Sequence, residues 1–348
     1  MRSRPKTGWT DMQANENQTS EALQVEVVKT TWAEWSRRHC HWIAALLALP
    51  AIAGVVGNIT SQFWWVSDLT THFQWQAVLY SFAVLIIALL GNNRFVAAMV
   101  FVSLLWHGSF VAPMYWGGHR LPPKTPTGQF KAMTFNVYAG KRDSEQVDAL
   151  IQQELPDVLC VEELTTHWHR HIKEHFAHHV AIPNDGAFGG GIYSPHELAD
   201  VQEIYLSDQN TSLQATLQLP EGPVTVIVVH CFPCVSADGT QLRDRQIKAI
   251  QEHVASLEGP VLVMGDFNAS PWTAPMRSLI TETQLHSSLR GAGPQCSWPA
   301  GNLLLRTPID HVFGSPELAF RNRRVGPACG SDHLPVIVDC IFSKPRRD

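Results

Sequence analysis

The sequence predicts a membrane region of about three transmembrane helices, followed by an α+β domain. Two observations support this fold class. Three long apolar stretches lie within residues 39–117, and with their flanks each is long enough to span a bilayer. After residue 128 the apolar runs become short and strand-like, and polar motifs end or interrupt most of them.

The chain divides into four parts, in order. They are a polar tail (1–38), the membrane region (39–117), a linker that contains the Pro-rich segment Leu121–Pro126 (118–127), and the α+β domain (128–348). The last part has roughly 220 residues, which is ample for one packed hydrophobic core.

The three apolar stretches are Trp42–Val56, Trp75–Leu90 and Phe95–Trp116. A spanning helix needs about 20 mostly apolar residues, so the third stretch qualifies alone and the first two qualify with their flanks. Pro50 is tolerated in a membrane helix. The alternative is three buried helices of a soluble domain, but the sequence contains no amphipathic segments that could cover them.

Basic residues predict the orientation. Lys29, Arg37 and Arg38 precede the first stretch, Arg94 lies between the second and third, and residues 58–74 contain no Lys or Arg. The positive-inside rule therefore places the tail in the cytoplasm. The basic residues after the third stretch argue mildly against this: Arg120, Lys124 and Lys131. We expect a multi-pass protein of the plasma (inner) membrane, with its domain on the outer, periplasmic side.

Five short polar motifs carry the candidate functional residues of the domain. They are Thr134–Val137, Asp157–Glu163, Val228–His230, Val263–Pro271, and the pair Ile309–His311 with Gly330–Leu334. Four of the five end or interrupt a strand-like run, so their polar side chains should emerge where loops build sites on a rigid sheet. These residue types suit metal-dependent hydrolysis of a phosphate ester.

Oxygen donors in these motifs could bind a hard divalent cation. Mg²⁺ prefers oxygen ligands and keeps several waters, so one or two carboxylates and an amide oxygen suffice. Asn136, Glu163 and Asp332 are the candidate ligands, and Mg²⁺ or Mn²⁺ is the expected cofactor. Arg306, three residues before Ile309, is a candidate for holding the substrate phosphate.

The catalytic candidates are two pairs and a further histidine. Asp266 and Asn268 lie two residues apart, so on an extended segment they would point the same way and could hold a water or the phosphate. His230 and His333 could protonate or hydrogen-bond a phosphoryl oxygen near neutral pH, and Asp310 is the expected partner of one of them.

The order of these residues resembles the endonuclease/exonuclease/phosphatase superfamily, over roughly residues 128–343. The resemblance implies a four-layer α/β/β/α sandwich of two packed sheets, with the site at one end of the sheets. It also implies that Glu163 binds the metal with Asp332 able to take part. It further implies that Asp266 and Asn268 position nucleophile and phosphate, that His333 pairs with Asp310, and that His230 contacts the scissile phosphate.

Two departures separate the chain from the abasic-site endonucleases of that superfamily. Tyr138 stands where those enzymes carry an aspartate, and the segment Ala187–Tyr193 lacks their tyrosine just before the Gly-rich strand. A role in base-excision repair is therefore disfavoured.

Charge narrows the expected substrate. From Leu121 onward the chain has 18 Lys and Arg against 25 Asp and Glu, a net charge of −7 with His neutral. Proteins that grip duplex nucleic acid usually carry a basic surface, so a phospholipid or small phosphate ester becomes more credible. We therefore expect a membrane-embedded phosphoesterase that uses activated water, with lipid and nucleic acid unresolved and no obligate protein partner evident. The alternative is a catalytically silent scaffold that retains the fold.

Two other patterns have alternative interpretations. His167, His171 and His175 would share one face of a helix and could hold zinc, but a solvated, outer-layer helix is favoured. Cys231 and Cys234 have the spacing of a redox motif, yet their flanks resemble a loop of the superfamily rather than a redox turn.

Overall fold

The computed structural model describes residues 9–116, 128–207 and 210–343. The chain forms two compact units, one of residues up to 53 with 79–105, the other of residues 54–78 with those from 106 onward. This division crosses the predicted membrane region, and the predicted linker 118–127 lies outside the described residues. Residues 54–78 therefore belong to the same unit as the α+β domain.

The first part of the chain is helical. The helices are α1 (Trp9–Thr60), α2 (Trp65–Thr71), α3 (Gln74–Leu90) and α4 (Arg94–Val111), followed by the short η1 (Ala112–Met114). Residues 34–60 and 94–114 are long and apolar enough to cross a membrane. The pair α2 and α3, bent by 72°, adds a third candidate only if it forms one span. The structure thus offers two candidate spans or up to three, and it leaves the predicted count of three unconfirmed.

The core of the first unit consists mainly of small apolar side chains. Ala44, Ala48, Ala88 and Ala97 are buried there together with valines. Small residues let helix backbones approach closely, which is typical of helices packed in a membrane.

The domain contains two six-stranded sheets. The first has the order β11-β12-β1-β2-β4-β3 and the second the order β5-β6-β7-β8-β10-β9. The first comprises β1 (Gln129–Asn136), β2 (Val158–Glu162), β3 (His178–Ile182), β4 (Gly190–Ser194), β11 (Leu318–Val325) and β12 (Val336–Phe342). The second comprises β5 (Leu198–Ser207), β6 (Asn210–Leu219), β7 (Gly222–His230), β8 (Val261–Asp266), β9 (His286–Ser287) and β10 (Asp310–Gly314).

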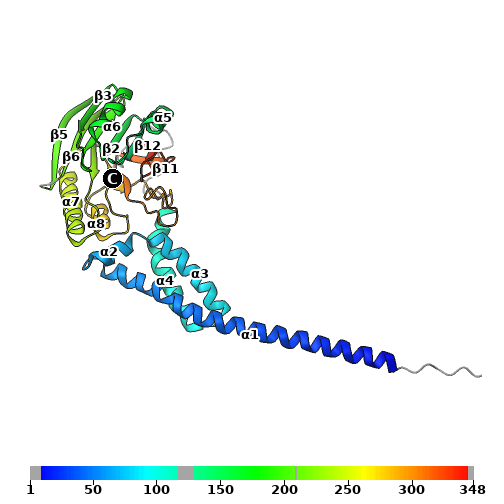
Figure 1. Cartoon of the computed structure of the whole chain (residues 1–348). Coiled ribbons are helices and arrows are strands. Elements are labelled where there is room, and N and C mark those ends of the chain that lie inside the picture. Colours follow the sequence, from blue (N-terminus) through cyan, green and yellow to red (C-terminus); the bar gives the residue numbers. More distant parts are fainter. Residues whose placement is uncertain (1–8, 117–127, 208–209, 344–348) are drawn as a thin grey trace, which may run out of the picture. The chain divides into compact units, whose positions relative to one another are not determined.

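Three apolar cores hold the layers together. The largest lies between the sheets, where Ala132 and Val158 of the first pack with Val226 and Leu262 of the second. On the outer face of the first sheet lie α5 (Glu145–Glu154) and α6 (Thr166–Ile172), followed by η2 (Lys173–His175). On the outer face of the second lie α7 (Ala237–Ala255) and α8 (Ala274–Glu282). The α+β class and the four-layer sandwich are confirmed (Figure 1).

Strand pairing brings the predicted site residues to one end of the sheets. β7 and β8 are parallel with His230 beside Asp266, and β10 runs antiparallel to β8 with Asp310 beside Asp266. Gly265 has φ +145°, and a Cβ there would lie 1.9 Å from the Val229 carbonyl oxygen. Only glycine therefore fits next to Asp266, because the neighbouring backbone occupies the space of a side chain.

The segment 54–78 packs on the domain through a buried ion pair. Arg243 of α7 and Asp68 of α2 are both buried, and Arg243 Nη1 donates to Asp68 Oδ2 at 2.8 Å. His72 Nε2 lies 3.8 Å from the same carboxylate and 3.5 Å from Cys234 Sγ. In addition, Trp75 packs against a small apolar core that contains Trp272. These contacts hold α2 and the start of α3 to the domain.

Candidate active site

Asp266 is the centre of the candidate site. It ends β8 and is 1% exposed. Its Oδ2 accepts a hydrogen bond from Asn136 Nδ2 at 3.2 Å, and lies 3.7 Å from His230 Nε2 and 3.6 Å from His333 Nε2. Three residues from three other predicted motifs therefore converge on one carboxylate oxygen of Asp266.

Asn268 meets Asp266 through a turn instead of an extended segment. Asn268 has φ +47°, in the left-handed region, and its backbone N–H donates to Asp266 Oδ1 at 2.8 Å. Its side-chain amide donates to the Cys231 carbonyl oxygen at 2.9 Å. The two side chains come together as expected, but the predicted extended conformation is wrong. An aspartate that accepts a bond from the backbone two residues later favours a turn.

His333 and Asp310 form a buried pair. Nδ1 of His333 lies 3.0 Å from Asp310 Oδ2, and both residues are almost completely buried. Burial alone would lower the pKa of His333, but the carboxylates of Asp310 and Asp266 outweigh it and raise this pKa to about 10. Burial would raise the pKa of Asp310, yet His333 holds it below its usual value. The pair is therefore an imidazolium and a carboxylate at neutral pH.

The pKa values of Asp266 and His230 shift in the opposite directions to those of Asp310 and His333. Burial, with a contribution from Asp310, raises the pKa of Asp266 to about 7 although His333 opposes the shift. Burial, together with the charge of His333, lowers the pKa of His230 to about 4. His230 is thus a neutral imidazole, and Asp266 is poised to exchange a proton near neutral pH.

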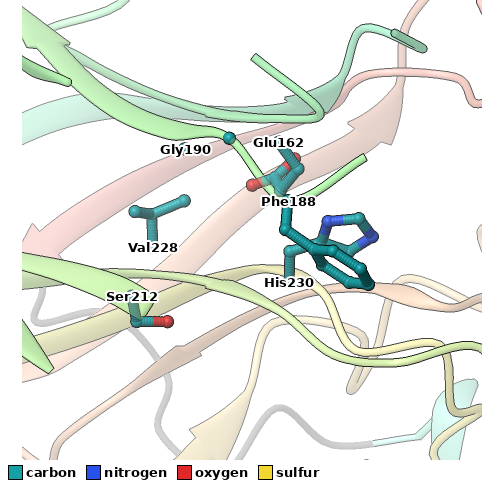
Figure 2. A pocket seen from close by; sticks show the side chains of 7 residues that line it. Glu162, Phe188, Gly190, Ser212, Val228 and His230 are labelled. Atoms are coloured by element: carbon teal, nitrogen blue, oxygen red, sulfur yellow. The ribbon is translucent and has the colours of Figure 1, made fainter. Parts of the chain in front are cut away.

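A small pocket lies beside His230. Its lining is Glu162, Phe188, Gly189, Gly190, Ser212, Val228 and His230. Figure 2 shows the rings of His230 and Phe188 next to each other, and their centroids are 5.5 Å apart. Burial raises the pKa of Glu162 well above its usual value, so this carboxyl is neutral. A Cβ on Gly189 would lie 2.0 Å from the Leu164 carbonyl oxygen, which confirms the close backbone approach that glycines favour.

The candidate metal ligands lie at the edge of this cluster. Glu163 Oε1 accepts from Asn136 Nδ2 at 3.1 Å, and Oε2 accepts from the Ala139 backbone N–H at 2.8 Å. Asp332 is exposed, and its Oδ2 accepts from Trp298 Nε1 at 3.1 Å. Hydrogen bonds therefore link Glu163 through Asn136 to Asp266, whereas the carboxylate of Asp332 bonds to Trp298.

The donor set fits a hard divalent cation. Glu163 and Asn136 supply oxygens of the kind that Mg²⁺ or Mn²⁺ prefers. In addition, Asp266, Asp310 and His333 place one potential ligand atom each within 4.8 Å of the others, and His333 would have to lose a proton to bind a cation there. Acidic and histidine groups that could hold a metal are thus present, while the individual ligand assignments stay predictions.

Arg306 is placed differently from the other candidates. Its guanidinium donates to the carbonyl oxygens of Pro299 and Ala300, within its own loop. The assignment of Arg306 to the substrate phosphate stays a prediction.

The three histidines of the possible zinc site each have a different hydrogen-bond partner. His167 contacts the Arg142 carbonyl oxygen, His171 contacts Ser144, and His175 contacts Asp148. The α-helix ends at Ile172, so the regular spacing predicted for these histidines stops before His175. Cys231 and Cys234 are both buried and free.

Two residues that support the site, Ser331 and Trp298, were not predicted from the sequence. Ser331 Oγ donates to the Asn136 carbonyl oxygen at 2.7 Å and accepts from the His333 backbone N–H at 3.0 Å. Its place inside the motif Gly330–Leu334 was a usable signal. Trp298, whose ring centroid lies 6.3 Å from that of His333, follows no motif that could have indicated it.

The fold and the site are those of a known protein family. Residues 133–333 match the model of the Endonuclease/Exonuclease/phosphatase family, so the chain belongs to that family. Its members are hydrolases that act on phosphoester bonds. No curated protein matches the chain.

Solved structures with a similar fold include three informative ones. An endonuclease/exonuclease/phosphatase from Beutenbergia cavernae is 21% identical, covering 62% of this chain and 72% of its own, with a TM-score of 0.50. Humanized D. rerio TDP2 is 15% identical (61% and 98% covered, TM-score 0.52). A mannosyl-6-phosphatase from Bacteroides thetaiotaomicron is 16% identical (61% and 100% covered, TM-score 0.51). At these identities the likeness concerns the fold alone.

The two shifted pKa values give an expected pH profile. If Asp266 activates the attacking water as a carboxylate, kcat/KM should fall as pH drops below about 7, and loss of the His333 proton should lower it again near pH 10. A bound cation favours the carboxylate, so more metal should move the acid limb to lower pH. The profile is measured at limiting and saturating Mg²⁺. A rate unchanged across pH 7 at limiting metal would contradict the role of Asp266.

Proposed function

We propose that this protein is a membrane-anchored phosphoesterase that depends on a divalent metal and uses activated water to hydrolyse a phosphodiester or phosphomonoester. The observation that carries the proposal is the convergence of Asn136, His230 and His333 on Asp266 Oδ2. A buried carboxylate between a neutral and a charged imidazole offers a base, a hydrogen-bonding group and a positive charge within one site.

Each residue has a role that follows from its protonation state. Asp266 takes a proton from the attacking water, and Asn268 fixes the carboxylate through its backbone N–H. His333, kept charged by Asp310, stabilises the negative charge that develops on the phosphoryl oxygens. The neutral His230 hydrogen-bonds the scissile phosphate. Mg²⁺ or Mn²⁺ near Glu163 and Asn136 would neutralise phosphate charge.

The membrane assignment rests on the first part of the chain. Two apolar helices could cross a bilayer, and basic residues precede the first. We propose a multi-pass protein of the inner membrane in which the pair α2 and α3 forms a third span, so that the catalytic domain lies on the periplasmic side. Residues 54–78 and the domain form one compact unit, which supports this proposal. When the tail is cytoplasmic, the loop after the first span lies on the outer side of the membrane, and the domain in the same unit would lie there too. Protease digestion of the domain in spheroplasts, but not in intact cells, is the expected result.

The metal and the reaction are tested together on the full chain in detergent. A generic phosphodiester, a phosphomonoester, a DNA fragment and mixed phospholipids are each incubated with Mg²⁺, Mn²⁺ or chelator. We expect turnover of at least one substrate that chelator removes and added metal restores. Turnover that persists in chelator would overturn the metal dependence.

Adjacent glutamates provide a matched comparison for the metal ligand. Glu163→Gln should raise the metal concentration needed for half-maximal activity by about 10- to 100-fold, because it removes the candidate ligand charge. Glu162→Gln should have a much smaller effect, since burial already keeps that carboxyl neutral. Metal titrations of both variants measure this. Equal effects would remove Glu163 from the metal site.

A further inference from the structure

The loop 299–306 exposes three consecutive leucines. Leu303, Leu304 and Leu305 are 76%, 81% and 52% exposed. Single exposed leucines are common on protein surfaces, but a contiguous apolar patch marks a site of interaction. The three exposed leucines therefore indicate a surface that binds an apolar partner.

The loop is held in shape by its own polar groups. The backbone N–H groups of Leu304 and Leu305 both donate to Asn302 Oδ1. Arg306 closes the loop by donating to the carbonyl oxygens of Pro299 and Ala300. The leucines thus project from a bonded turn, and Arg306 has a role in that turn.

One end of the loop is bonded to the candidate active site. The Ala300 backbone N–H donates to the Asp332 carbonyl oxygen at 2.7 Å. The Trp298 indole N–H donates to the Asp332 carboxylate, and its ring lies near that of His333. The leucines are therefore presented from the loop that borders the catalytic residues.

The other end is bonded to α3, which belongs to the bent helix pair that could form a third span. Gln76, in the first turn of α3, donates to the carbonyl oxygens of Leu304 and Arg306, at 3.3 and 2.8 Å. Gln76 and the loop lie in the same compact unit. Exposed aromatic side chains follow the ends of two other membrane-type helices, as is typical of a membrane interface: Phe63, Trp64, Tyr115 and Trp116. In a topology in which α3 crosses the bilayer, the loop bonded to its first turn would lie near the bilayer surface.

We propose that the loop 299–306 inserts Leu303, Leu304 and Leu305 among lipid acyl chains, so that the substrate of the site is the phosphoester of a membrane lipid. This inference rests on the phosphoesterase function proposed above. The net charge of −7 from Leu121 onward favours a lipid over a nucleic acid, which a basic surface would bind. The leucines hold the acyl region of the lipid while its phosphate reaches Asp266 and His333.

The test compares a leucine-free loop with the wild type in the full chain. The variant combines Leu303→Ser, Leu304→Ser and Leu305→Ser. The control combines Val201→Ser and Tyr205→Ser, which replace exposed apolar side chains on β5. Each protein is assayed with Mg²⁺ on bis(p-nitrophenyl) phosphate in solution, on mixed phosphatidylethanolamine and phosphatidylglycerol vesicles, and on a DNA duplex.

The triple variant should keep its rate on the soluble diester, which also shows that it is folded. Because burying one leucine favours binding by about tenfold or more, its kcat/KM on vesicle lipid should fall at least about tenfold, mainly through KM. The control should match the wild type on both substrates.

The other outcomes separate the two proposals. A wild type that hydrolyses none of the three substrates, and no phosphomonoester such as p-nitrophenyl phosphate, would defeat the proposed function itself. A wild type that hydrolyses the soluble diester or DNA but no lipid would overturn only the inference on the loop. An equal lipid rate in wild type and triple variant would overturn it as well.

Discussion

Replacement of Asp266 by asparagine should lower kcat by roughly 10²- to 10⁴-fold while the chain stays folded. Asparagine keeps the shape of the side chain but cannot accept a proton from water. It also loses the charge that lies 3.6 Å from His333 Nε2 and helps to raise the pKa of that histidine. Steady-state kinetics on the best substrate, with thermal unfolding of the same preparation, measure both effects.

The control is Asp339→Asn, since Asp339 bonds Asn322 on an exposed part of the first sheet. This variant should keep wild-type kinetics. Wild-type activity in Asp266→Asn would remove Asp266 from the mechanism. A wild-type chain that stays folded and hydrolyses no phosphate ester with any metal would favour the silent scaffold, and then Asp266→Asn should leave partner binding intact.

The second large effect concerns stability. Arg243→Met should destabilise the protein by about 3–5 kcal/mol, because it leaves the buried Asp68 carboxylate without its guanidinium partner. Chemical unfolding of the full chain in detergent measures the change.

Two further variants make this stability test specific. Arg245→Met removes an exposed arginine two residues away and should change stability little. Adding Asp68→Asn to Arg243→Met should recover part of the loss, because it removes the buried carboxylate that has lost its guanidinium partner. If both Arg243 variants were as stable as the wild type, the ion pair would contribute nothing to the folded state.

Local patterns in the sequence predicted those parts of the fold that depend on neighbouring residues. A strand-like apolar run that ends in a polar residue identified the ends of β1, β7 and β8 at Asn136, His230 and Asp266. The resemblance added the order of the layers and the pairing of His333 with Asp310. The same local reasoning failed at Asn268, where one hydrogen bond to Asp266 sets a left-handed turn that an alternating pattern does not reveal.

Contacts between segments that are far apart along the chain could not be predicted from the sequence. Asp68 and Arg243 are separated by 175 positions, and neither belongs to a motif. Each looked like an ordinary charged residue, one beside a membrane stretch and one on an outer helix. Likewise, nothing near Leu303 indicated that Gln76 would bind its loop, since such a bond depends on the packing of residues 74–78 on the domain.

Residues 54–78 belong to the same compact unit as the α+β domain, so the domain should be inherited together with them. A gene fragment that starts in the Pro-rich segment would encode Arg243 without Asp68 and Trp272 without Trp75. Recombination at that point would thus create chains with a charged and an apolar surface left open. Related proteins should therefore contain the membrane segment and the domain together. Substitutions at Asp68 and Arg243 should occur in the same sequences.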